Sequence, residues 1–341
     1  MVFVKLWIQF IIVISIVGGL AGLFRFFDEI DSINSTYSIF DALIISVLGI
    51  PRRLYLDLPL ITLIAIATGF GSMVRTNELL VIQSCGIEAK RLIFYAILSM
   101  SPILAGSLFY GEYGFSLIET FSNKIGRNKL NDDSVRFAWT KEDDGFVRFS
   151  VMPDGRVSSV IIYKLSYETG LLERLESENV NIIAGQLAFF DADRLEFSEN
   201  QVEFNKAEGE IAARVTGDQA VWLAGDIATL GLSMIFAAAK YRDSVNLNNY
   251  RHWLIFFERL FLPITLVIMI CMGASIFLTS FVRGSMSTSI VQLILVGLFY
   301  KIVSDFMTPL SELLGLYPML GAIAPLSIPL FFMRWLFSQS S

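Results

Sequence analysis

The stretch LWIQFIIVISIVGGLAGLFRFF, residues Leu6–Phe27, decides the class of fold. It holds a single charged side chain, Arg25. A helix needs about 20 apolar residues to cross roughly 30 Å of bilayer hydrocarbon. The stretch is therefore predicted to span a membrane. Cleavage as a signal peptide is disfavoured because the apolar run continues past Gly22 through Phe27 and contains no A-x-A site.

The composition of the whole chain agrees with a membrane protein. Of its 341 residues, 54% are hydrophobic and 17% are charged, which is far from the balance of a soluble domain. Five further apolar stretches bring the expected number of spanning helices to six. They are Leu58–Val74, Leu92–Tyr110, Trp253–Phe281, Ser289–Met307 and Pro318–Phe337.

Residues 111–249, between the third and fourth stretches, are polar and show the alternation typical of β-strands. Strands are expected at Val157–Tyr163, Gln186–Phe190 and Gln201–Phe204, separated by turn residues such as Pro153–Gly155. Short strands at this spacing indicate an antiparallel sandwich or jelly roll. The predicted fold is a membrane bundle of six helices, residues 1–110 and 250–341, with an inserted all-β, jellyroll-like domain.

The distribution of Lys and Arg predicts the orientation, because cytoplasmic loops carry an excess of both residues. We expect both termini in the cytoplasm and residues 111–249 outside it. This orientation leaves three basic residues, Arg25, Arg52 and Arg53, on the outer side. The basic residues that it places inside are Lys5, Arg75, Lys90, Arg91, Arg283 and Arg334.

The loop after the second span, Arg75–Ile87, has the pattern of a short surface helix. Thr76 or Asn77 is expected to cap it, and Gly86 to end it. Its predicted apolar face contains Leu79, Leu80, Ile82 and Cys85. Such a helix either fills a groove on a partner protein or rests in the lipid interface, and the residues alone favour neither.

The three outer arginines suggest a site for an anionic amphiphile. Arg25 ends the first span, and Arg52 and Arg53 follow Pro51. Interfacial arginines commonly extend toward lipid headgroups, but a guanidinium also binds phosphate through paired hydrogen bonds. Together the arginines would form a positive rim above an apolar cavity.

Lys301 lies midway through the fifth span, where a charge costs about 3 kcal/mol or more, so we expect it to face the bundle interior or an aqueous cavity. Asp305, one turn later, is its expected partner. The pair is either structural or part of a substrate surface.

Several classes of function are disfavoured. The chain contains no P-loop, no G-x-S-x-G elbow, no H-E-x-x-H and no Cys/His metal spacing, and its one histidine is His252. A net charge of −6 argues against a nucleic-acid partner. The chain is therefore expected not to be an enzyme and to bind no cofactor or metal directly, so that energy for transport comes from a partner or an ion.

The segment RTNELLVIQSCGI, Arg75–Ile87, resembles the cytoplasmic coupling segment of the LptF/LptG permeases, which extract lipopolysaccharide from the inner membrane. Asn77 stands where that family usually has Ser. The resemblance extends over essentially the whole chain. Further motifs resemble the LptG branch of the family: Phe24–Asp28, Ile50-Pro51 with Leu58-Pro59, Gly111–Tyr113, and Asp305–Leu310 followed by Gly315, Pro318 and Pro325.

This resemblance implies a location in the bacterial inner membrane and a set of partners. An LptB-like ATPase dimer would hydrolyse ATP and dock at the coupling segments of this chain and an LptF-like paralogue. LptC- and LptA-like proteins would carry lipopolysaccharide onward. The expected coupling residues are Glu78, Leu79, Leu80, Ile82 and Gly86; the expected lipopolysaccharide contacts are Arg25, Arg52, Arg53 and Lys301.

Two other interpretations remain. A mechanotransmission permease would couple ATP hydrolysis to a change of shape without moving lipid, and such chains typically have four spans. A membrane-bound enzyme would place its active site in the β-domain, at acids such as Asp191, Asp193 and Glu196. Alternating acids on a strand are more often a solvated face.

Overall fold

The computed structural model forms two compact units, residues 1–118 with 254–341 and residues 119–253, and each is described by itself. The structure describes residues 2–33, 37–126, 136–142, 145–152, 157–166, 170–178, 180–183, 186–189, 192–197, 202–207, 211–224, 226–283 and 286–340.

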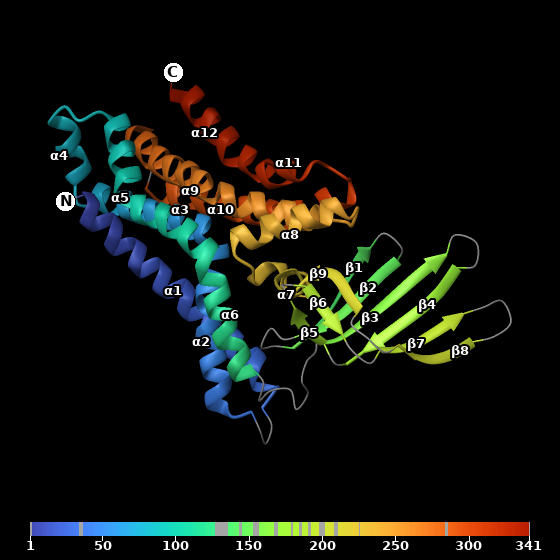
Figure 1. Cartoon of the computed structure of the whole chain (residues 1–341). Helices are drawn as coiled ribbons and strands as arrows, with labels where there is room; N and C mark the ends of the chain where they lie inside the picture. The colour runs from blue at the N-terminus through green and yellow to red at the C-terminus, as the bar shows by residue number, and fades with distance from the viewer. Residues whose placement is uncertain are drawn as a thin grey trace. The chain divides into compact units, whose positions relative to one another are not determined.

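The first unit is helical (Figure 1). Five of its helices are long and apolar enough to cross a membrane, at Val2–Ile30, Leu58–Arg75, Ala89–Ile118, Tyr250–Phe277 and Val291–Leu313. They confirm the first five predicted spans. The α-helices before and after the β-unit have these bounds: α1 (Val2–Ile30), α2 (Ile39–Leu56), α3 (Leu58–Arg75), α4 (Glu78–Ser84), α5 (Ala89–Phe109), α6 (Phe115–Gly126), α9 (Tyr250–Arg283), α10 (Met286–Leu313), α11 (Pro318–Ile323) and α12 (Ser327–Ser340).

The sixth predicted span differs from the other five because it is broken. A 3-10 turn, Ala324–Leu326, separates α11 from α12, and the apolar helical stretch Pro318–Arg334 is shorter than the other spans. Pro325 lies in the turn, and Pro329 lies in the first turn of α12. Proline lacks an N–H group, so two prolines four residues apart interrupt the backbone hydrogen bonds of a continuous helix.

Helix α2 was not predicted from the hydropathy pattern, although its start is encoded locally. Ser38 and Asp41 form a capping box in which each side chain accepts from the other residue's backbone N–H. The helix packs on α1, where a side chain on Gly22 would lie 2.9 Å from Ile50. Small residues on α1 therefore allow the two helices to approach closely.

Helix α3 is the centre of the first unit. Its side chains are buried on most sides against α1, α5, α9 and α10, and Leu63, Ile66 and Phe70 have no more than 1% of their surface exposed. Glycines on the neighbouring helices allow α3 to pack closely against them. A Cβ on Gly273 of α9 would lie 3.1 Å from Ile66, and one on Gly297 of α10 would lie 2.8 Å from Leu60. Close packing of this kind holds membrane helices together without a hydrophobic driving force between them.

The second unit contains two antiparallel sheets, which confirms the predicted β insert. One sheet has the order β1-β2-β3-β4-β7-β8 and the other β5-β6-β9. The expected strands appear as β3, β6 and β8, whereas Pro153–Gly155, Phe190 and Gln201 lie outside the described residues. The strands are β1 (Arg136–Glu142), β2 (Gly145–Val151), β3 (Val157–Ser166), β4 (Gly170–Ser177), β5 (Val180–Ile183), β6 (Gln186–Phe189), β7 (Ala192–Phe197), β8 (Val202–Ala207) and β9 (Ile211–Thr216).

One face of the larger sheet forms the core of this unit. Val147, Phe149 and Val160 are fully buried there, and Leu223 of α7 packs against the same cluster. Helices α7 (Gly217–Ala224) and α8 (Leu232–Ser244) follow β9, so residues 111–249 are not purely β as the sequence pattern suggested. Leu232–Ser244 lacks the two-residue alternation of a strand and is helical.

The packing around α3 predicts that Gly297 tolerates no branched side chain. Gly297→Val would push on Leu60 and Leu63 of α3 and lower the free energy of unfolding by about 1–3 kcal/mol. Gly106→Val is the matched control, because a Cβ there meets nothing within 4 Å, and its effect is expected within about 0.5 kcal/mol. Thermal unfolding of both variants in detergent measures the difference; equal melting temperatures would refute the close packing of α3 and α10.

Candidate functional site

The segment between the second and third spans folds as predicted into a short helix, α4, but its caps differ in part. Asn77 is the N-cap in a left-handed conformation, with φ 58°, and its side chain forms no capping hydrogen bond. The Thr76 hydroxyl instead donates to the Ser72 carbonyl at 3.0 Å. Gly86 follows the helix with φ +82°, which is the conformation that a glycine-terminated helix requires.

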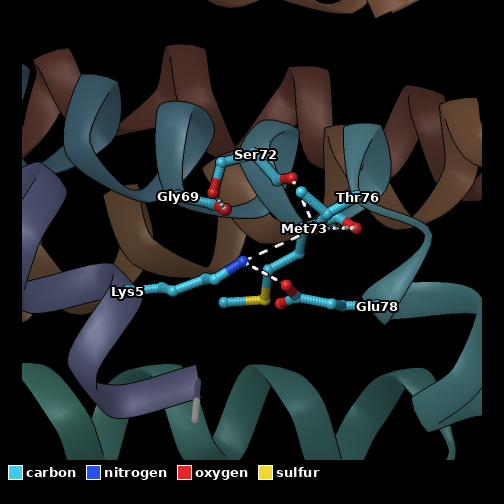
Figure 2. Close-up of polar contacts among 6 residues, drawn as sticks. All are labelled: Lys5, Gly69, Ser72, Met73, Thr76 and Glu78. Carbon is cyan, nitrogen blue, oxygen red and sulfur yellow. Dashed lines mark hydrogen bonds and ion pairs between the residues drawn. The ribbon is translucent and has the colours of Figure 1, made fainter.

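An ion pair ties α4 to the start of the first span. Lys5 Nζ donates to Glu78 Oε1 at 2.5 Å and lies 3.5 Å from Thr76 Oγ1. Figure 2 shows the Lys5 ammonium, which comes from the first span, beside Thr76 at the end of α3 and Glu78 at the start of α4. The sequence pattern singled out Glu78, whereas its partner Lys5 is 73 residues away and was considered only for membrane orientation.

The Lys5 hydrogen bond lowers the pKa of Glu78 below its ordinary value. A carboxylate whose pKa is lowered in the folded state stabilises that state above the pKa of the unfolded chain. The stabilisation is lost as the pH falls through the lowered value. The contact between α1 and α4 is therefore at full strength at neutral pH and persists into acid.

The apolar side chains of α4 point in two directions, some into the bundle and some away from it. Leu79 is fully buried and Ile82 packs against the core of the bundle. Leu80 is 50% exposed and its neighbour Val81 57% exposed. Leu79 and Ile82 therefore anchor the helix, and the surface that a partner can reach contains Leu80 and Val81 instead.

A second charge network lies at the opposite end of α3. Asp57, between α2 and α3, accepts from Arg53 at 2.8 Å and from Lys301 of α10 at 3.1 Å. Lys301 also pairs with Asp305 at 3.0 Å, as its position one turn away predicts. Asp57 is 8% exposed and was missed. Its spacing of four residues from Arg53 is a local signal that could have found it, whereas its pairing with Lys301 depends on how the helices pack.

The two networks are separated by the length of α3, roughly 27 Å for its 18 residues. Since α3 is a candidate membrane span, they lie toward opposite membrane surfaces. Arg53 and Lys301 are brought together through Asp57.

Arg25 is outside this network. Its guanidinium fills the space above Gly49 of α2, and its Nε is buried without a hydrogen-bond partner among the described residues. Arg52 lies on α2, partly buried, and interacts electrostatically with Tyr110.

An aromatic cluster between α2, α5, α6 and α9 contains a further cation that the sequence pattern did not single out for a role. The Arg259 guanidinium lies 3.9 Å from the ring of Phe115 and is 7% exposed. The third span carries a π-helical turn here, Tyr110–Gly114, of the kind that often marks functional sites. A side chain on Gly111 would lie 2.9 Å from the Tyr55 hydroxyl, so this position of the Gly-Glu-Tyr motif needs its glycine for packing.

These features define a class of protein. A bundle of apolar spans carries an inserted antiparallel β-unit, and it presents a short surface helix that is tied to its first span by an ion pair. The class is a membrane protein with several spans and an inserted β-unit.

Comparison with known proteins specifies the family. Residues 1–339 match the family described as lipopolysaccharide export system permease LptF/LptG, and the chain belongs to that family. One relative is the lipopolysaccharide export system permease protein LptG of Haemophilus influenzae, which is 21% identical over 94% of this chain and 92% of the relative. Another is the protein of the same name from Escherichia coli K12, which is 21% identical over 95% of this chain and 92% of the relative. The family resemblance read from the motifs is confirmed, and the chain is a permease rather than an enzyme.

The Lys5–Glu78 contact predicts a charge-swap result. Glu78→Lys and Lys5→Glu each place like charges together and should lower the melting temperature in detergent. The double variant should recover most of the loss, because it restores an opposite-charge pair. Glu88→Lys is the control, since Glu88 is exposed and pairs with no described residue. If the two single effects simply add in the double variant, the ion pair contributes nothing.

Proposed function

We propose that this chain is the LptG-like membrane subunit of an ATP-driven transporter that extracts lipopolysaccharide from the inner membrane. A separate LptB-like ATPase dimer would supply the energy, an LptF-like permease would be its paralogous partner, and LptC- and LptA-like proteins would receive the lipid. The observation that carries the proposal is α4, a helix locked to the bundle by Leu79 and Glu78 while Leu80 and Val81 face outward.

The contacts of α4 suggest how a push from the ATPase would spread. Helix α4 follows α3 directly in the chain and holds α1 through Lys5. At its other end α3 meets α10 through Asp57 and Lys301. A displacement of α4 would therefore act on the first and fifth spans, which the family resemblance assigns to the lateral gates for lipid.

The basic residues at the far end of α3 are proposed to contact lipopolysaccharide phosphates. Arg25, Arg52, Arg53 and Lys301 belong to this end of the bundle, and the Arg53 side chain is 60% exposed. We place this end, with the β-unit, on the periplasmic side and both termini in the cytoplasm.

The alternative functions have less support. The five long spans exceed the four expected of a mechanotransmission permease. For an enzyme in the β-unit, Asp193 and Glu196 project from opposite faces of β7 because side chains alternate along a strand, and Asp191 lies outside the described residues. Glu196 also pairs with Arg194.

Coupling through α4 predicts that Leu80→Asp uncouples transport. The variant places a charge on the exposed surface proposed for the ATPase, so complex yield or lipopolysaccharide release from reconstituted vesicles should fall by about tenfold or more. Val202→Asp is the matched control, because it places the same charge on an exposed apolar position, 62% exposed, outside α4. A complex with Leu80→Asp that assembles and transports normally would remove α4 from the interface.

The substrate role predicts that Arg25→Gln reduces photocrosslinking to lipopolysaccharide while assembly with the ATPase is unchanged. Neutralising Arg25 removes a phosphate-binding cation but retains a polar side chain beside Gly49. Lys90→Gln, at the other end of the bundle, should crosslink like the wild type. Unchanged crosslinking of Arg25→Gln would show that the guanidinium serves only the packing of α1 on α2.

A further inference from the structure

The outer face of the larger β-sheet carries aromatic side chains that are exposed to solvent. Side chains alternate along a strand, so Val147 and Phe149 enter the core whereas Arg148 between them points away from it. The register places Trp139 of β1 opposite Arg148 of β2. We define the aromatic platform as Phe137, Trp139, Arg148 and Tyr163.

The platform is a continuous layer of stacked groups. The Arg148 guanidinium lies 4.2 Å from the centre of the Phe137 ring and 5.9 Å from that of Trp139. The rings of Trp139 and Tyr163 stack at 5.6 Å with 22° between their planes. Phe137 is 55% exposed and Trp139 49% exposed. Exposed apolar patches of this kind on soluble surfaces mark interaction sites.

The charge of the platform has no opposite charge paired with it among the described residues. Arg174 and Arg194, in the same sheet, pair with Glu176 and Glu173, but Arg148 forms no ion pair with any residue in the part of the chain that the structure describes. Its guanidinium is held over the rings, and the residue is partly exposed. Such a cation favours a ligand that is anionic as well as flat.

We propose that the aromatic platform binds the anionic saccharide part of lipopolysaccharide. This inference rests on the proposed function and extends it to a second contact, outside the membrane bundle. One face of a pyranose ring presents C–H groups that pack on Trp139 or Phe137, and its rim presents hydroxyl, phosphate or carboxylate groups that accept hydrogen bonds from Arg148.

The size of the platform favours a sugar over a protein. Four side chains match one or two sugar rings, whereas a stable protein partner covers about 800 Å² of each surface. On the neighbouring strand β4 this face is polar, because β4 places Arg174 and Glu176 beside Tyr163 and Ile161.

The test uses the full chain in nanodiscs and a delipidated, phosphorylated core oligosaccharide prepared from lipopolysaccharide. Trp139→Ala should weaken its binding by about tenfold, and Arg148→Gln should remove the preference for the phosphorylated over the dephosphorylated oligosaccharide. Phe204→Ala is the matched control: Phe204 is 60% exposed on the same face, at the opposite edge of the sheet, and its loss should change nothing. Calorimetry measures binding, and circular dichroism checks that each variant is folded.

Several outcomes would overturn the inference. These are no binding of the oligosaccharide to the wild-type chain, equal effects of Trp139→Ala and Phe204→Ala, or loss of a periplasmic protein partner in Trp139→Ala with oligosaccharide binding intact. Failure here is distinguishable from failure of the proposed function. If only this inference fails, the reconstituted complex still extracts lipopolysaccharide. If the proposed function fails, the complex extracts none, whatever the platform binds.

Discussion

The pairing of charges at the two ends of α3 is the constraint on which the first unit depends. A charge among apolar spans is tolerated only with a partner close by. Asp57 is paired with both Arg53 and Lys301, and Glu78, on the surface helix α4, is paired with Lys5. The Asp57–Lys301 pair joins the start of α3 to α10, and the Glu78–Lys5 pair joins α4, which follows α3, to α1. The most buried span is thus connected at one end to α1 through α4 and at the other end to α10.

The proposed function requires a displacement to pass along the bundle, and the packing of α3 bears on that requirement. Helix α3 is packed tightly enough that its neighbours carry glycine at the points of contact, which leaves it little free space in which to bend. The exposed residues of α4, Leu80 and Val81, lie beside the buried Leu79. A partner that pushes on the exposed pair therefore also moves the anchored residue.

The β-unit uses its two faces for different purposes. The inner face buries Val147, Phe149 and Val160 and supplies the stability of the unit. On the outer face the rings of Trp139 and Phe137 contact Tyr163 and Arg148 but remain about half exposed. Aromatic residues left in water cost solubility, so their presence is better explained by a ligand than by folding.

The sequence by itself determined the membrane class, the first five spans and the β insert, because hydrocarbon accepts only helices whose backbone groups bond internally and strands alternate with a period of two. It also determined local contacts, such as Lys301 with Asp305 and the αL glycine after α4. Only the tertiary structure decided that Lys5 pairs with Glu78, that Asp57 joins Lys301, and that Leu79 faces inward while Leu80 faces outward. These depend on which helices pack together, and a pairing across 73 residues leaves no trace in the periodicity of either segment.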